Sequence, residues 1–258
     1  EERGSSMGTV IAFANQKGGV AKTTSTYNVG TALARAGKKT LMIDLDGQAS
    51  LTISAGLEPY DFEHSIVSAL EKDAIPLERC IQHLQENLDI VTSRLELAQL
   101  EVVLIGRPVR ETILRRAIGP VRSRYDFILI DCPPQLSILT INALASADQV
   151  LIPVKTDYLA YRGLEQLLDT VAEIRELVNP QLSILGVIAT MYEMRVKDDQ
   201  EILRLLQDKY DVIAVVKKLA IVKKGVYDGK AVMEQAPNND AAAEYQKVAE
   251  CIMEKGGI

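Results

Sequence analysis

The sequence predicts an α/β fold in which a doubly wound, mostly parallel sheet is flanked by helices. Three short apolar runs, residues 9–14, 39–46 and 125–134, alternate with segments whose apolar residues recur at helical spacing. Such alternation is typical of parallel sheets, where residues at the carboxyl ends of the strands meet at one edge. No linker, repeat or low-complexity tract divides the chain, so we expect a single domain over residues 7–258. Residues 1–6 resemble an expression-tag remnant.

The composition narrows the class of protein. Of the 258 residues, 47% are hydrophobic and 25% are charged, which is ordinary for a soluble globular protein. A net charge of −6 argues against a chain that coats nucleic acid over its whole surface, so any such contact must be a local patch. Cys80, Cys132 and Cys251 show no Cys-x-x-Cys spacing, which disfavours a disulfide framework or a zinc site and favours a cytoplasmic location. No apolar run is long enough for a transmembrane helix.

Helix breakers and apolar spacing divide the rest of the chain. Residues 53–85 are polar and loosely helical, with Pro59 and Pro76 as breakers, so we expect short surface helices there. A second break at residues 106–108 separates two helical segments. Further strands are expected at 88–92, 147–154 and 183–191, and helices at 25–36, 94–105, 108–124, 158–178 and 241–255.

The segment 15–24 lies in the turn between the first strand and the first helix, where a phosphate would bind. Gly18 and Gly19 allow the backbone to turn its N–H groups around an anion, and the helix adds the positive end of its dipole. Lys22 adds a full charge, and Thr23 offers a hydroxyl to a magnesium ion. The alternative is a glycine-rich turn without a ligand.

Carboxylates end two of the predicted strands. Strand 39–46 ends in Asp44 and Asp46, which alternation places on the same side if the strand continues that far. Four consecutive apolar residues end in Asp131, so a buried strand delivers this acid to the sheet edge, where it can bind the shell of a magnesium ion. The alternatives are a solvated strand end for the first pair and a structural acid for Asp131.

These motifs together resemble one family. Lys17-Gly-Gly-x-x-Lys-Thr-Thr24 resembles the deviant Walker A motif of the ParA/MinD family of P-loop ATPases, and the preceding Asn-Gln is most similar to its ParA/Soj branch. Residues 44–52 and 125–145 resemble further motifs of that family. The resemblance is strong over residues 8–180 and partial beyond, and it implies a deviant P-loop NTPase that uses ATP and Mg²⁺.

The resemblance also implies a role for individual residues. Lys17 would reach across a dimer interface to the partner's nucleotide, and Lys22 would hold the phosphates of its own subunit. Asp46 would orient or activate the attacking water, which makes Lys17 and Asp46 the catalytic residues. Magnesium would be held by Thr23, Asp44 and Asp131. The expected nucleotide-binding residues are Lys17, Gly18, Gly19, Val20, Ala21, Lys22, Thr23, Thr24 and Met191.

The chain departs from the family pattern at several loop positions. Ala21 stands where the family has glycine, and a positive φ there would cost on the order of 1 kcal/mol and weaken nucleotide binding. Gly47, Ala49 and Ser50 also differ from the family residues, which leaves the geometry of that loop open.

The family function would be that of a partitioning switch. The resemblance implies an ATPase that dimerises on ATP, binds double-stranded DNA without sequence preference, and hydrolyses ATP slowly to drive plasmid or chromosome partitioning. It implies a ParB-like centromere-binding or adaptor partner with a short basic N-terminal segment, a nucleoid-associated location and no stable membrane insertion. The alternatives are a MinD-like membrane-cycling or other cargo-positioning ATPase, an iron–sulfur reductase, for which bridging cysteines are missing, and an enzyme acting on a small metabolite.

Charge in the last third of the chain is locally basic. Residues 195–230 hold nine Lys or Arg residues against six acids. By resemblance, DNA contacts are expected at this end of the chain, and lysines can bind phosphates as point charges. The alternative is a solvated face without a partner. The candidate DNA-binding residues are Arg195, Lys217, Lys218, Lys223 and Lys224.

Overall fold

The computed structural model of this protein describes residues 7–218, 220–221 and 228–256. The expected tag remnant, residues 1–6, lies outside the described residues, as do the candidate DNA-binding residues Lys223 and Lys224. Within the described part of the chain, no helix is long and apolar enough to cross a membrane.

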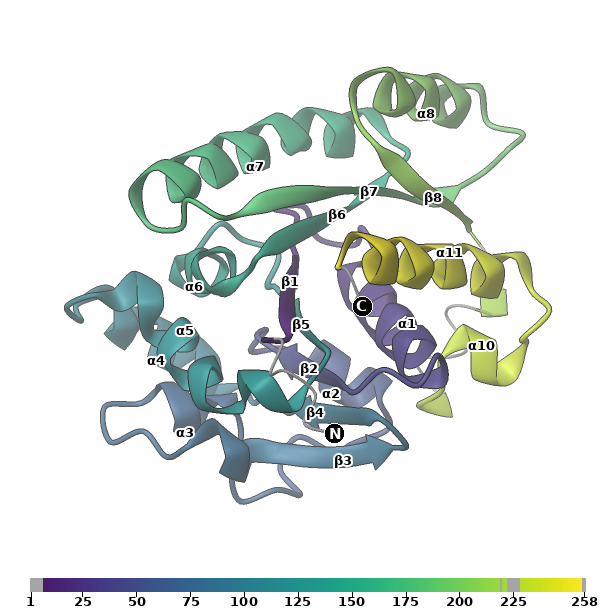
Figure 1. Ribbon diagram of the computed structural model, residues 1–258. Coiled ribbons are helices and arrows are strands. Elements are labelled where there is room, and N and C mark those ends of the chain that lie inside the picture. The colour runs from purple at the N-terminus through teal and green to yellow at the C-terminus, as the bar shows by residue number, and fades with distance from the viewer. Residues whose placement is uncertain (1–6, 219, 222–227, 257–258) are drawn as a thin grey trace.

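Eight strands form one sheet in the order β3-β4-β2-β5-β1-β6-β7-β8, which confirms the predicted α/β fold (Figure 1). All neighbouring pairs among these strands are parallel except β3 with β4, which is antiparallel. The strands are β1 (Thr9–Phe13), β2 (Thr40–Asp44), β3 (Ile81–Gln85), β4 (Leu88–Val91), β5 (Phe127–Asp131), β6 (Gln149–Lys155), β7 (Ser183–Tyr192) and β8 (Val212–Lys217).

Helices cover both faces of the sheet (Figure 1). One face carries α1 (Lys22–Arg35), α2 (Ser50–Ser54), α10 (Val232–Gln235) and α11 (Asp240–Lys255). The other carries α3 (Ile66–Leu70), α4 (Glu96–Ile105), α5 (Ile113–Ile118), α6 (Ile138–Ser146), α7 (Tyr158–Leu177) and α8 (Lys197–Lys209). Short 3₁₀ turns are η1 (Leu77–Cys80), η2 (Arg110–Thr112) and η3 (Gly119–Arg124).

The central strands are buried on both faces, as their continuous apolar sequence requires. Every residue of β2 and β5 is buried, and their side chains alternate between two apolar layers. Phe127 points into the layer under α1 and α11, whereas Ile128 belongs to the layer on the opposite face. In the register of the sheet, Asp131 lies beside Phe13 of β1 and beside Asp44 of β2. The carboxyl ends of these three strands are therefore adjacent.

The last helix packs against the body of the protein. Tyr245, Val248 and Ile252 of α11 are fully buried in the layer that α11 shares with α1 and β8. The apolar face of α11 is therefore used for core packing.

The edges of the sheet differ from the prediction. Residues 53–85 were expected to be helical, but Ile81–Gln85 forms edge strand β3, and the prediction did not include strand β8 at the opposite edge. Strand β3 is only partly buried and lacks a continuous apolar run, whereas β8 contains such a run at residues 212–216 that the prediction did not assign to a strand. The expected helix 108–124 is broken into η2, α5 and η3, with Val109 at a positive φ of 53° and Pro120 in the last piece.

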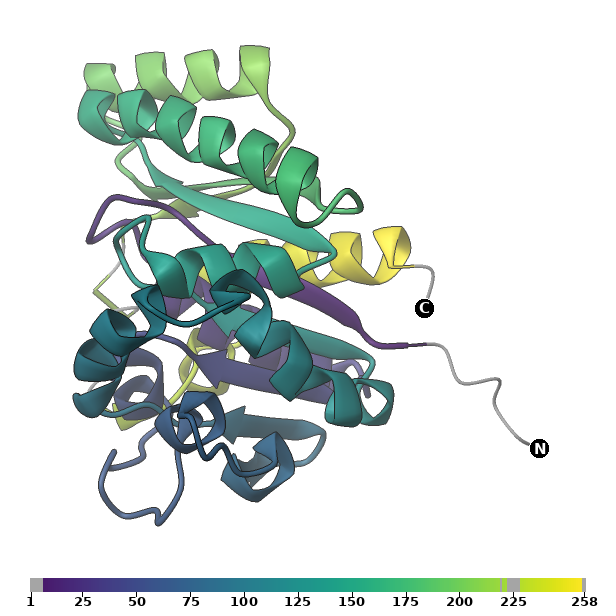
Figure 2. The same ribbon diagram turned by 90° about the vertical axis from the view of Figure 1, so that its left-hand side faces the viewer.

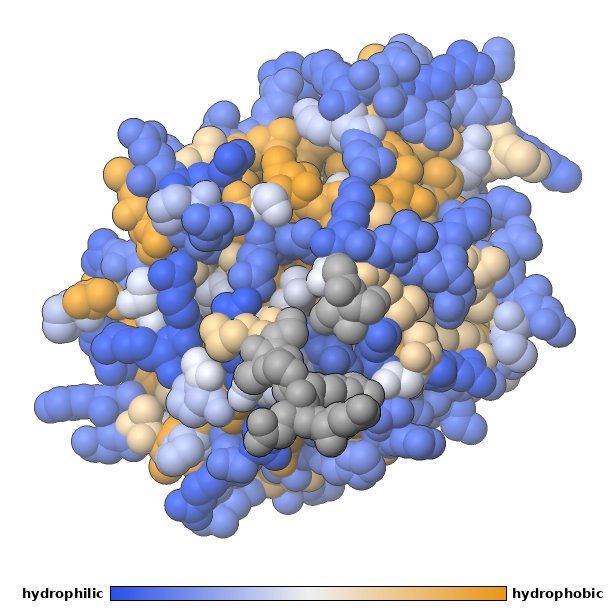
Figure 3. Space-filling view, in the orientation of Figure 1, coloured by the Kyte–Doolittle hydropathy of each residue, from blue (hydrophilic) through white to orange (hydrophobic). Residues whose placement is uncertain are grey.

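The orientation of the strands fixes where a ligand can bind. In Figure 2, β1 begins and α11 ends on the right-hand side, and the loop after β1 lies on the left. The face with the amino ends of the parallel strands is drawn in Figure 3, where an apolar area lies between α7 and the strands β7 and β8 on an otherwise mostly hydrophilic surface. The carboxyl ends of the parallel strands, where ligands of such sheets bind, lie on the opposite side of the molecule.

Candidate functional site

The loop between β1 and α1 is held in place by one hydrogen bond within the loop and two to neighbouring strands. The buried Asn15 donates from Nδ2 to the carbonyl oxygen of Pro153 (2.7 Å) and accepts at Oδ1 from the backbone N–H of Lys17 (3.0 Å). Thr190 on β7 donates to the carbonyl oxygen of Val20 (3.0 Å). Strands β6 and β7 therefore fix both ends of a glycine-rich cradle, a role that the sequence did not reveal for Asn15 or Thr190.

A cavity of about 400 Å³ opens beside this loop. It brings together most of the predicted nucleotide-binding residues and the predicted catalytic Asp46. Ser50, Ile53 and Ser54 of α2 also line it and were not among the predicted site residues. The lining residues are Gly18, Gly19, Val20, Ala21, Lys22, Thr23, Thr24, Asp46, Ser50, Ile53, Ser54, Cys132, Pro134 and Met191.

A buried acid lies at the base of this cradle. Asp131, at the end of β5, is fully buried and accepts hydrogen bonds from Thr23 Oγ1 (2.6 Å) and Thr26 Oγ1 (3.3 Å). Burial, together with the nearby charge of Asp44, raises the pKa of Asp131 to about 8. A carboxylate whose charge is so poorly solvated is suited to a cation, because a hard cation prefers oxygen ligands such as this acid and the Thr23 hydroxyl.

Lys22 is the first residue of α1 and is almost completely buried. Its Nζ donates to the carbonyl oxygen of Lys17 (3.1 Å), so the ammonium group lies under the loop. Burial lowers the pKa of Lys22, and the charge of Asp131 opposes this shift. An anion in the cavity would add favourable interactions to this partly desolvated charge.

Asp44 supports the loop that carries Asp46. It is fully buried, and its Oδ2 accepts from both the N–H and the hydroxyl of Thr52 (2.8 Å each), while Oδ1 accepts from the N–H of Asp46 (3.2 Å). Burial raises the pKa of Asp44 to about 6. The strand ends at Asp44, so the alternation expected for the two acids does not apply: Asp46 borders the cavity and Asp44 lies behind it.

The described residues hold no group of three or more His, Cys, Asp or Glu side chains arranged as a metal site. A magnesium ion held by Thr23 and Asp131 would therefore need further oxygen ligands from a phosphate or from water. Both donors are hard oxygen ligands, which is the donor set that fits this ion.

Lys17 lies apart from the cavity. Its side chain is exposed and extends along Gly163 of α7, where an added Cβ would come 3.2 Å from Lys17 Cε. The neighbouring Gln16 donates to the carbonyl oxygen of Gly163 (2.8 Å). Of the predicted nucleotide-binding residues, Lys17 alone does not line the cavity.

Backbone strain is concentrated around the cavity. Ala21 (φ 63°, ψ 33°) and Ala49 (φ 53°, ψ 33°) precede α1 and α2 in the left-handed region, and Met191 has a φ of 56°. Ala21 thus has the positive φ that was considered from the sequence, and this conformation costs on the order of 1 kcal/mol relative to glycine. Strain of this kind persists where surrounding contacts over-determine the backbone, which is common at functional sites.

The predicted basic surface is partly neutralised. Lys217 pairs with Asp240 (2.6 Å) and Lys218 pairs with Glu193 (2.7 Å). Arg195 is exposed and has no ion pair within the part of the chain that the structure describes.

Comparison with known proteins identifies the family. A family model described as an AAA domain matches residues 8–184. The sporulation initiation inhibitor protein Soj of Bacillus subtilis is 36% identical over 254 residues, which cover 97% of this chain and 100% of that protein.

Solved structures are similar over almost the whole chain. A plasmid partition protein from Borrelia burgdorferi has a TM-score of 0.79 at 25% identity, with 97% of this chain and 100% of that chain covered. Cobyrinic acid a,c-diamide synthase from Mycobacterium smegmatis, with bound ADP and magnesium, has a TM-score of 0.83 at 31% identity, with 98% and 97% covered. The glycine-rich loop and the acid at the end of β5 match the motifs of these relatives. The chain therefore belongs to the ParA/Soj group of P-loop ATPases within the AAA domain family.

Proposed function

We propose that this protein is an ATP-driven partitioning switch: it binds Mg²⁺ and ATP, dimerises in the ATP form, binds DNA without sequence preference, and hydrolyses ATP slowly. The observation that carries the proposal is the buried Asp131 bonded to Thr23 beside Lys22, at the base of a glycine-rich cradle. ATP supplies the phosphate charge that the cradle and Lys22 bind, and the acid and hydroxyl oxygens hold magnesium.

Asp46 is the residue we assign to water activation. Its backbone N–H donates to Asp44 Oδ1, and Asp46 is one of the residues that line the cavity. Because Asp44 is in turn tied to Thr52, the position of Asp46 is set by buried groups. A carboxylate held in this way can orient a water molecule toward a terminal phosphate.

Lys17 is the residue we assign to dimerisation. Its exposed side chain lies over α7 and outside the cavity of its own chain, which supports a role toward a nucleotide in a second copy. In that position its ammonium group would neutralise charge that develops on the transferred phosphoryl group.

Two alternatives are weighed against this proposal. A MinD-like membrane cycle commonly uses an amphipathic C-terminal helix, but the apolar face of α11 is already buried against the sheet. The second alternative is an enzyme that acts on a small metabolite, and its support is the likeness to cobyrinic acid a,c-diamide synthase. The rate of ATP hydrolysis with and without duplex DNA distinguishes these functions, because we expect stimulation by DNA and the ParB-like partner only for the partitioning switch.

We expect Mg²⁺ and ATP to convert a monomer to a dimer, and Lys17→Ala to prevent this while leaving nucleotide binding intact. The reason is that Lys17 does not line the cavity whereas Lys22 does. Sedimentation velocity with ATP, with ADP and without nucleotide measures the change, with Lys22→Ala as a control that loses nucleotide binding. An unchanged mass under all three conditions would exclude the dimer switch.

The variant Asp46→Ala should bind ATP and dimerise but turn over about 10²-fold more slowly or worse, because the lost group acts mainly in the transition state. The matched control is Asp61→Ala, which removes an exposed acid outside the cavity and should leave turnover within about twofold. Phosphate release and nucleotide affinity are measured on both variants. Turnover of Asp46→Ala close to that of the unmodified protein would assign water activation to another group.

Changing Lys217, Lys218, Lys223 and Lys224 to Glu should abolish DNA binding by the ATP form, whereas changing all four to Arg should preserve it, since arginine keeps the charge. Binding should fall steeply with salt because phosphate contacts release counterions. The measurement is a titration on unrelated duplexes at low and moderate salt with ATP. Equal affinity of the Glu variant and the unmodified protein would remove this surface from DNA binding.

A further inference from the structure

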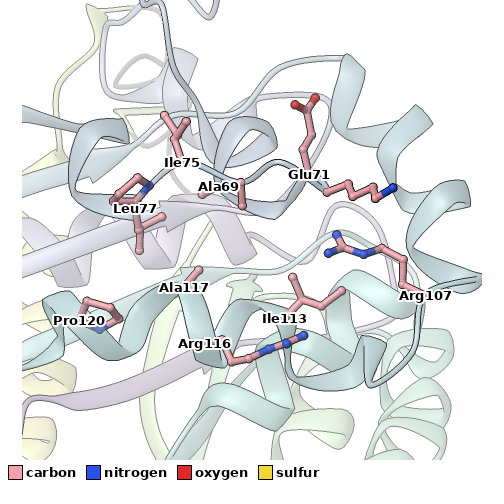
Figure 4. A pocket seen from close by; sticks show the side chains of 12 residues that line it. Ala69, Glu71, Ile75, Leu77, Arg107, Ile113, Arg116, Ala117 and Pro120 are labelled. Atoms are coloured by element: carbon pink, nitrogen blue, oxygen red, sulfur yellow. The ribbon is translucent and has the colours of Figure 1, made fainter.

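A second cavity, of about 390 Å³, lies between the segment around α3 and η1 and the helix α5 (Figure 4). It has no lining residue in common with the nucleotide cavity. Its apolar part is formed by Ile75 and Leu77 on one side and by Ile113 and Ala117 on the other, as Figure 4 shows. An apolar floor of this size accepts one or two apolar side chains.

Three basic side chains border this floor: Lys72, Arg107 and Arg116, with Glu71 as the single acid among the lining residues. Arg107 donates to the carbonyl oxygen of Leu70 (2.6 Å), which ties its guanidinium group to the end of α3 at one end of the cavity (Figure 4). Among the described residues, none of the three cations lies within ion-pair distance of an acid. The cavity therefore has an excess of positive charge that no ion pair among the described residues neutralises.

The same excess is visible in the chain around the cavity. Residues 107–124 contain six arginines and one acid, in a protein whose net charge is −6. Three of these arginines have acidic partners, through the pairs Arg110 with Glu111, Arg122 with Asp148 and Arg124 with Glu78. Arg115 instead donates to the backbone carbonyl of Ala145. Arg107 and Arg116, which line the cavity, therefore differ from these arginines in having no acidic partner among the described residues.

The segment around Arg107 also exposes apolar side chains. The end of α4 leads directly to Arg107 and exposes Val102, Val103 and Ile105 by 70, 61 and 54%, and Val109, two residues beyond Arg107, is 64% exposed. Large apolar side chains exposed in such number on one short segment are typical of a protein-binding surface. None of the four lines the cavity itself, so they add exposed apolar surface on the segment that carries Arg107.

We propose that this cavity is the docking site for an acidic, apolar segment of a partner protein, with an apolar side chain on the Ile75–Ala117 floor and carboxylates paired with Lys72, Arg107 and Arg116. Charge complementarity selects this occupant, because an extended segment with alternating acids and apolar residues matches both the floor and its rim. The basic segment expected of a ParB-like partner would be repelled here. The proposal does not rest on ATP hydrolysis or DNA binding by this protein.

The test uses a fluorescein-labelled peptide of alternating glutamate and leucine residues, titrated with the whole protein at low salt and followed by fluorescence polarisation. The double variant Lys72→Glu/Arg116→Glu should bind at least about 10-fold more weakly. The matched control, Arg175→Glu/Lys197→Glu, makes the same change of charge at exposed positions on α7 and α8 and should bind within about twofold of the unmodified protein. Circular dichroism verifies that both variants are folded.

Two further peptides separate charge from apolar contact. Replacing the glutamates by lysines should abolish binding, and replacing the leucines by serines should weaken it at least about 10-fold, because the floor would then have no partner. The proposal is overturned if the peptide does not bind, if the Lys72/Arg116 variant binds as well as the control, or if the serine peptide binds equally. It is also overturned if duplex DNA displaces the peptide from the unmodified protein and loses its own affinity in the Lys72/Arg116 variant, since the surface would then bind nucleic acid.

Discussion

The burial of Asp131 at the end of β5 is the constraint on which the rest of this site depends. A carboxyl group without access to water is costly to ionise unless a cation or several donors compensate it. Here the compensation comes from Thr23 and Thr26 of α1, with Lys22 close by, so the first turn of that helix must lie against the end of β5. The parallel register of β1 and β5 meets this requirement by placing Phe13, the last residue before the loop, beside Asp131.

The neighbouring loops are arranged around the same point. Asp44 lies next to Asp131 in the sheet register and uses its oxygens to hold Thr52 and the turn to Asp46. Ala21 and Ala49 enter their helices from the left-handed region, which costs on the order of 1 kcal/mol each relative to glycine. The fixed contacts of Asn15 and Thr190 help to maintain that strained geometry. The site is thus held in position by buried groups from four strands.

The central strands, the phosphate loop and the position of Asp131 could be predicted from the sequence, because continuous apolar runs and glycine spacing depend directly on local structure and burial. The sequence was insufficient where the outcome depends on tertiary contacts. Edge strand β3 is only partly buried and lacks a continuous apolar run, and the short apolar run of edge strand β8 does not by itself distinguish a strand from a helix. The position of Asp44 behind Asp46 depends on Thr52, and the ion pairs of Lys217 and Lys218 depend on acids far along the chain.

The most direct test of this account is the thermal stability of the unmodified protein and of Asp131→Asn across pH, with and without Mg²⁺ and ATP. The folded-state pKa of Asp131, near 8, lies above its unfolded value near 4, so without nucleotide its ionisation should progressively destabilise the unmodified protein as pH rises between these values. Asparagine removes this contribution, and the variant should gain stability relative to the unmodified protein over that range. Mg²⁺ and ATP should then stabilise the unmodified protein far more than the variant. Parallel pH profiles, or equal stabilisation of both proteins by Mg²⁺ and ATP, would contradict the account.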